Sequence, residues 1–147
     1  MPLLSCTWPG KPLVAALLLA AVGCGSDLPQ TVKVTGRVTF DGQPPPAAGS
    51  VLFLPTEAAE GFPLRPGSGA FAADGQFQAQ TFEPGDGLMP GKYLISIECW
   101  DTPPNMQGNP GKSYVPKKFQ SPQTSGLKLD ITPNMRRQQV TFDVVTK

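Results

Sequence analysis

Apolar and polar side chains alternate along several short stretches of this chain, which is the pattern of half-buried β-strands. The clearest stretch is 92–100, where the two predicted faces carry Tyr93, Ile95, Ile97 and Cys99 against Leu94, Ser96, Glu98 and Trp100. Turn residues at Gly87, Pro90 and Gly91 come directly before it. We expect this stretch to form a central, largely buried strand.

Six further segments show the same alternation, so the predicted strands are 31–40, 50–54, 69–73, 76–81, 92–100, 127–132 and 138–145. Proline and glycine occupy 34 of 147 positions, well above an average share of about 12%. Such frequent turn residues favour short strands over long helices. The spacing predicts an all-β, antiparallel two-sheet sandwich of about seven strands. Gly36 falls on the apolar face of the first strand, where we expect a bend or close packing.

The first 23 residues follow a different pattern and are predicted to be a signal peptide. Lys11 precedes an apolar run over 12–22, which as a helix would cover roughly 16 Å, about half of a bilayer's hydrocarbon core. The run is therefore too short to span a membrane and has the length of a secretory h-region. A buried helix of the domain is the weaker alternative, because the run is apolar on every side.

The end of this segment, Ala21-Val22-Gly23-Cys24, resembles the lipobox of bacterial lipoproteins. The resemblance implies that Cys24 becomes the new N-terminus and carries a diacylglyceryl group and an N-acyl chain such as palmitate. One acyl chain binds a membrane only marginally, whereas two or three anchor stably. The common leucine three places before the cysteine is Ala21 here. An ordinary secretory peptide cleaved in the same region is therefore the alternative.

Residue 25 and the segment after it bear on where an anchored chain would reside. Gly25 stands where enteric bacteria place the Asp that retains lipoproteins at the inner membrane, so the resemblance favours the outer membrane. Residues 24–30 are small and polar and are predicted to be a short tether. The predicted organisation is a signal peptide (1–23), a tether (24–30) and one domain (31–147).

Four short motifs, taken in order, resemble the carboxypeptidase regulatory-like (transthyretin-like) β-sandwich family. They are 34–43 (VTGRVTFDGQ), 49–55 (GSVLFLP), 73–77 (ADGQF) and 88–97 (LMPGKYLISI). The resemblance implies a prealbumin-like sandwich with Greek-key connections over 31–147. The C-terminal part also resembles small bacterial lipoproteins that carry this domain and have no assigned activity.

Charge and composition argue against several classes of function. The net charge is +1 and basic residues occur at most in pairs, so nucleic acid is not an expected partner. The chain has no histidine, which removes Ser-His-Asp and Cys-His catalysis and His-ligated metals. Hydrolases with the transthyretin architecture use a histidine-containing site and a C-terminal Tyr-Arg-Gly-Ser, both absent here. We therefore expect no enzymatic activity, no cofactor and no metal.

Glu57, Glu60 and Asp74 could supply oxygen ligands to Ca²⁺, but solvated loop charges are the better interpretation.

The three cysteines have separate predicted fates. Cys6 would leave with the signal peptide, Cys24 would be lipidated, and Cys99 would remain alone, so no internal disulfide is expected. Cys99 has no histidine to activate it and shares a face with Ile95 and Ile97. A small buried apolar residue is its expected role.

The loop 101–122, rich in Pro, Gly, Asn and Gln, is the predicted binding surface because loops of this length are usually functional or disordered. Trp100, Tyr114 and Phe119 could stack on a sugar or grip a peptide. The alternative is that Tyr114 and Phe119 pin the loop onto the domain.

The sequence thus predicts a lipid-anchored, non-catalytic module of the cell envelope with a structural or binding role and a protein or glycan partner. A carbohydrate-binding module that uses the aromatics near Trp100 is the alternative.

Overall fold

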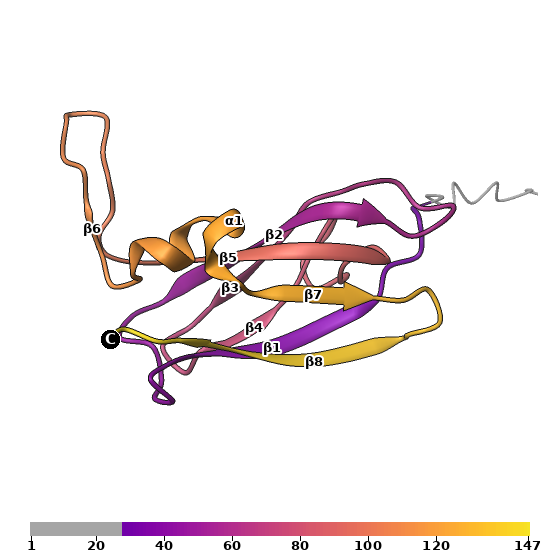
Figure 1. The fold of residues 1–147 in the computed structure, drawn as a ribbon, viewed down its shortest axis with the longest axis horizontal. Coiled ribbons are helices and arrows are strands. Elements are labelled where there is room, and N and C mark those ends of the chain that lie inside the picture. Colours follow the sequence, from indigo (N-terminus) through magenta and orange to yellow (C-terminus); the bar gives the residue numbers. More distant parts are fainter. Residues whose placement is uncertain (1–27) are drawn as a thin grey trace, which may run out of the picture.

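The computed structural model describes residues 28–147, and almost all of their regular structure is β-strand (Figure 1). The predicted signal peptide 1–23, the lipidation site Cys24 and most of the tether lie outside the described residues. The elements are β1 (Lys33–Phe40), β2 (Gly49–Ala58), β3 (Gly67–Phe71), β4 (Gln76–Gln78), β5 (Gly91–Thr102), β6 (Lys112–Ser113), the 3₁₀ turn η1 (Lys117–Gln120), α1 (Pro122–Ser125), β7 (Lys128–Ile131) and β8 (Arg137–Val144). The predicted all-β class is confirmed, and each predicted strand is present.

The strands form one hydrogen-bonded sheet in the order β6-β5-β2-β3-β4-β1-β8, and β7 also pairs with β5. β2 runs along one edge of β5, while β7 and β6 share the other edge, so β5 is central as predicted. One part of the prediction is wrong: the sheet is mixed rather than antiparallel, because β1 and β8 run parallel over their whole length. Alternation shows which side chains face inward, but it carries no information on strand direction.

Four aromatic rings show that the sheet curls round its core. Phe53 of β2 and Phe142 of β8 are separated along the sheet by β3, β4 and β1, yet their ring centroids lie 6.3 Å apart. Phe77 of β4 stacks on Phe142 at 6.0 Å, and Tyr93 of β5 meets Phe53 edge-on at 6.4 Å. These rings and the inward-facing aliphatic residues of β1 and β5 form one cluster, consistent with the predicted alternation.

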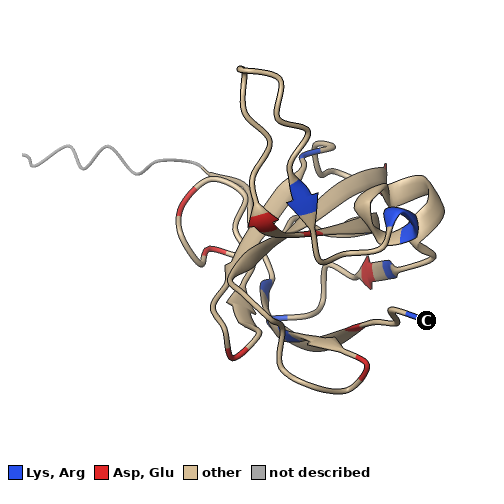
Figure 2. Ribbon diagram, turned by 90° about the vertical axis from the view of Figure 1, so that its left-hand side faces the viewer, with Lys and Arg blue, Asp and Glu red and all other residues tan. Residues whose placement is uncertain are grey.

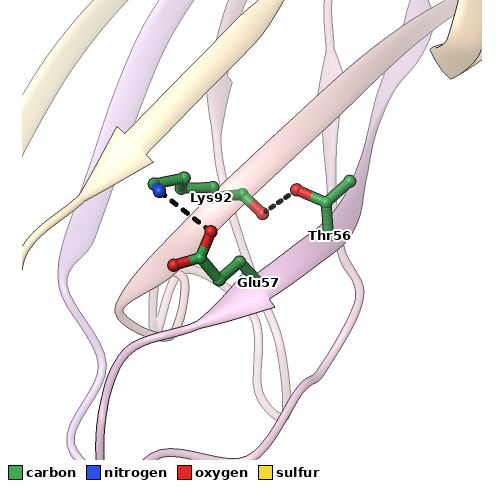
Figure 3. Close-up of polar contacts among 3 residues, drawn as sticks. All are labelled: Thr56, Glu57 and Lys92. Atoms are coloured by element: carbon green, nitrogen blue, oxygen red, sulfur yellow. Dashed lines mark hydrogen bonds and ion pairs between the residues drawn. The ribbon is translucent and has the colours of Figure 1, made fainter.

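β2 continues four residues beyond its predicted end through a bulge next to Pro55. The register with β5 shifts between Pro55 and Glu57, so Thr56 is the extra residue. Its hydroxyl donates a hydrogen bond to the carbonyl of Lys92 at 3.2 Å, and the Lys92 ammonium lies 2.8 Å from Glu57 (Figure 3). The ion pair is exposed and adds little stability. Pro55 itself is tolerated because its nitrogen points to the β3 side of β2, beyond the last β2–β3 pair at Phe53 and Gly67, where no ladder hydrogen bond is lost.

The segment between β6 and β7 fills the edge of β5 that these two short strands leave open. The carbonyl of Leu127 accepts a hydrogen bond from the Ile95 amide, and the Ser125 hydroxyl donates to the Ile95 carbonyl. Val115 and Phe119 join the hydrophobic core. The predicted long loop 101–122 is therefore largely ordered. Its start pairs with Lys112–Ser113 near its middle, and its second half is packed against the domain.

Candidate functional site

The most prominent surface feature is the hairpin that joins β5 to β6, which projects beyond the body of the domain (Figure 1). Asparagine side chains order its turn: Asn105 Oδ1 accepts hydrogen bonds from the amides of Gln107 and Asn109, each at 3.1 Å. Asn109 Oδ1 in turn accepts from the Gly111 amide at 2.9 Å. Met106 lies within this turn and is fully exposed. The hairpin is thus a projection held in shape by its own side chains.

Two of the three predicted binding aromatics lie at the base of this hairpin. Trp100 is half-buried and pairs with Ser113 across the β5–β6 ladder. Tyr114 is exposed at 37%, and its hydroxyl donates to Asp101 Oδ1 at 2.9 Å. The hydrogen bond to the Asp101 carboxylate raises the pKa of Tyr114. Lys112 lies on the other side of this carboxylate, with its ammonium 3.5 Å from Asp101 Oδ2.

Phe119 does not belong to a binding surface. Its side chain is 6% exposed and sits in the hydrophobic cluster, with Lys118 Nζ 5.3 Å from its ring centroid. The expectation that Phe119 stacks on a ligand is therefore corrected, and the alternative that it pins the segment onto the domain is confirmed for this residue. The aromatic surface that remains consists of Trp100 and Tyr114.

A second surface, which the sequence interpretation missed, is the outer face of β4, β1 and β8. It is hollowed by a depression of about 580 Å³ that includes Thr35, Gln76, Gln78 and Gln80. The strand register sets Thr35 between Gln78 and Gln139, and a neighbouring row sets Arg37 between Gln76 and Thr141. Glutamines at alternate positions over 76–80 are the signal that could have revealed this amide-rich face.

A smaller hollow of about 400 Å³ lies where β5 and β7 pair. Its wall includes Lys92, Leu94, Lys128 and Asp130, and thus carries charges of both signs. Charged side chains are few over the whole domain, and both signs are scattered (Figure 2). None of the predicted aromatics lines either hollow.

Cys99 has the buried role that the sequence predicts. Its side chain is fully buried, and its thiol lies 3.4 Å from the carbonyl of Ala47. Burial raises the pKa of the Cys99 thiol, which keeps the weakly nucleophilic protonated form. Residues 28–147 contain no cluster of three or more acidic or cysteine side chains that could hold a metal ion. No helix within the same residues has the length and apolar character needed to cross a bilayer.

Comparisons with known proteins assign no family to this chain. No protein-family model matches it, and no curated protein matches it. Among solved structures, 80% of the chain is similar to part of a 9R-lipoxygenase from Cyanothece PCC8801, with 11% identity and a TM-score of 0.38. The chain spans only 16% of the length of that protein. At this TM-score the similarity supports no functional argument.

Proposed function

We propose that this chain is a lipid-anchored, non-catalytic β-module of the bacterial cell envelope that presents its β5–β6 hairpin to a partner. The observation that carries the proposal is the placement of the two ends of the domain. The described chain enters β1 at one end of the long axis, and the hairpin projects at the other (Figure 1). A membrane anchor at Cys24 would therefore hold the hairpin, with Trp100 and Tyr114 at its base, away from the bilayer.

The short distance along the chain from Cys24 to the fold supports an anchoring role. Val32, eight residues after Cys24, is already fully buried and pairs through its backbone with Leu88. So few residues extend over less than about 30 Å even when fully stretched. The domain would thus be held close to the membrane surface, with its protein or glycan partner reached by the hairpin.

We also propose that the domain is of the carboxypeptidase regulatory-like, prealbumin-like type, with two layers and Greek-key connections. The motif residues support this, because they fall at the expected places in the fold. Asp41 and Gly42 both adopt positive φ in the turn after β1, and Gly75 does so in the β3–β4 hairpin. Gly91 opens β5 and is followed by the buried Tyr93. The two layers would be the opposite walls of the curled sheet.

The proposed anchor is tested by membrane fractionation of cells that express the full chain. Wild-type protein is expected in the membrane fraction, resistant to high salt, because several acyl chains anchor stably. Cys24→Ala is expected to yield protein without acyl chains. Cys6→Ala, the matched control in the same leader, should behave as wild type. Wild-type protein that high salt releases from the membrane fraction would contradict the proposal.

A carbohydrate-binding module is the second candidate, and the half-buried Trp100 beside the projecting hairpin is the observation that favours it. If glycan stacks on this ring, Trp100→Ala should weaken co-sedimentation with peptidoglycan by about tenfold or more. Leu64→Ala is the matched control, because Leu64 is exposed and lies in the β2–β3 connection. This candidate would be excluded if wild type does not bind peptidoglycan, or if Trp100→Ala binds it as well as wild type does.

A further inference from the structure

The last strand, β8, presents an unpaired edge. Along its length β8 pairs with β1, and the Arg136 and Val144 carbonyls accept hydrogen bonds from the amides of Lys33 and Asp41. Backbone groups alternate in direction along a strand, so the even-numbered residues of β8 point to β1. The odd-numbered ones, Arg137, Gln139, Thr141 and Asp143, point their N–H and C=O groups to the open side. Nothing within residues 28–147 pairs with these groups.

This edge lacks several of the usual protections against strand addition. β8 is eight residues long and contains neither a proline nor a bulge, and natural edge strands are usually shortened, bulged or blocked by such residues. It forms the lower margin of the sheet in Figure 1. The four residues whose backbone faces outward also carry exposed side chains on the outer face.

We infer that β8 pairs with β8 of a second copy of this chain, antiparallel and across a two-fold axis at Val140. In that register Arg137 lies opposite Asp143 of the second copy, and Gln139 opposite Thr141. Both of these pairs join two odd-numbered residues, whose backbone groups point to the open side, so both backbone hydrogen bonds of each pair can form. The sheets of the two copies become continuous.

The charges select this register and this occupant. Shifting the two strands by two residues either way keeps the hydrogen bonds possible but sets Arg137 opposite Thr141, or Asp143 opposite Gln139. The centred register alone joins opposite charges on the exposed face at both ends, and such cross-strand pairs stabilise a sheet. A strand that complements itself in this way fits a second copy of the same chain.

The isolated domain leaves both charges ready for such a partner. Arg137 lies directly beside Lys33 in the β1–β8 register, and neither cation makes an ion pair within residues 28–147. Asp143 is fixed from one side, because its Oδ1 accepts hydrogen bonds from the Thr39 hydroxyl at 2.6 Å and the Gly42 amide at 2.9 Å. Oδ2 of Asp143 accepts no hydrogen bond in this part of the chain. The carboxylate of Asp143 in the second copy would lie on the open side of Arg137 and give this cation the opposite charge that it lacks in the isolated domain.

Charge reversal tests the inference by sedimentation velocity on the full chain in a density-matched non-ionic detergent. Wild type is expected to form a dimer. Arg137→Asp sets like charges opposite each other at both ends and should raise the dimer dissociation constant by about tenfold or more. Asp143→Arg should do the same. The combined variant Arg137→Asp, Asp143→Arg restores opposite charges and should restore the dimer. Two chains that only share a detergent micelle would stay associated whatever the charge at positions 137 and 143.

Gln139→Pro supplies a second test that keeps the fold. Its amide points away from β1, so proline removes an edge donor without breaking the β1–β8 ladder. Dimer loss with an unchanged circular dichroism spectrum supports the inference. A monomeric wild type, a dimer that withstands Arg137→Asp and Gln139→Pro, or a folded charge-swapped variant that stays monomeric would overturn it.

Discussion

Phe53→Ala is expected to lower the free energy of unfolding by about 3–5 kcal/mol. Phe53 is 1% exposed and stands at the centre of the aromatic cluster, with ring centroids of Phe77, Tyr93 and Phe142 at 6.1, 6.4 and 6.3 Å. These rings come from β4, β5 and β8, so the cavity would open where the opposite walls of the curled sheet meet. A closely packed interior relaxes only partly into such a cavity.

Urea unfolding followed by tyrosine and tryptophan fluorescence measures this loss. Leu52→Ala is the matched control, because Leu52 neighbours Phe53 on β2 but faces outward at 36% exposure. The control is expected to cost well under the core value, about 1 kcal/mol or less. Similar losses for the two variants would show that β2 does not present Phe53 to a shared core.

Gly36→Val is the second large effect expected, with a cost of about 3 kcal/mol. A Cβ atom at position 36 would lie 2.4 Å from the Val140 carbonyl oxygen and 2.7 Å from Cζ of Phe77. The first of these atoms belongs to the β1–β8 ladder and the second to the aromatic cluster, so neither can move without cost. The added methyl groups therefore act on the pairing and on the core together.

The same unfolding experiment tests this prediction, with Lys33→Val as the matched control. Lys33 lies on β1 as well, but its side chain is exposed. Valine favours strands, so this control should change stability by about 0.5 kcal/mol or less. A Gly36→Val protein as stable as wild type would mean that the Phe77 ring is not packed against β1.

How much of this fold the sequence reveals depends on the physical property concerned. Alternation placed the strands and identified Tyr93, Ile95, Ile97 and Cys99 as the buried face of β5, because inward orientation is a local property of the chain. Close packing at Gly36 was predicted from the same pattern. The parallel direction of β8 was not predicted, since pairing partners depend on contacts far apart in the sequence.

The candidate site was predicted less completely, also for physical reasons. An aromatic residue in a polar loop sequence can face the solvent or anchor the loop, and composition does not separate these cases. Tyr114 is exposed, whereas Phe119 is buried. The two-residue strand β6 was missed because a pair such as Lys112-Ser113 carries no alternation signal. The amide-rich face over β4, β1 and β8 joins residues of three strands, so it emerges only from their register.

The anchor at Cys24 is the central claim, and intact mass spectrometry of the protein extracted from membranes tests it most directly. We expect one mature species that begins at Cys24 and carries the added mass of a diacylglyceryl group and an acyl chain. This mass should be absent in Cys24→Ala and retained in Cys6→Ala. A wild-type protein recovered without acyl mass, whether uncleaved or cleaved elsewhere, would contradict it.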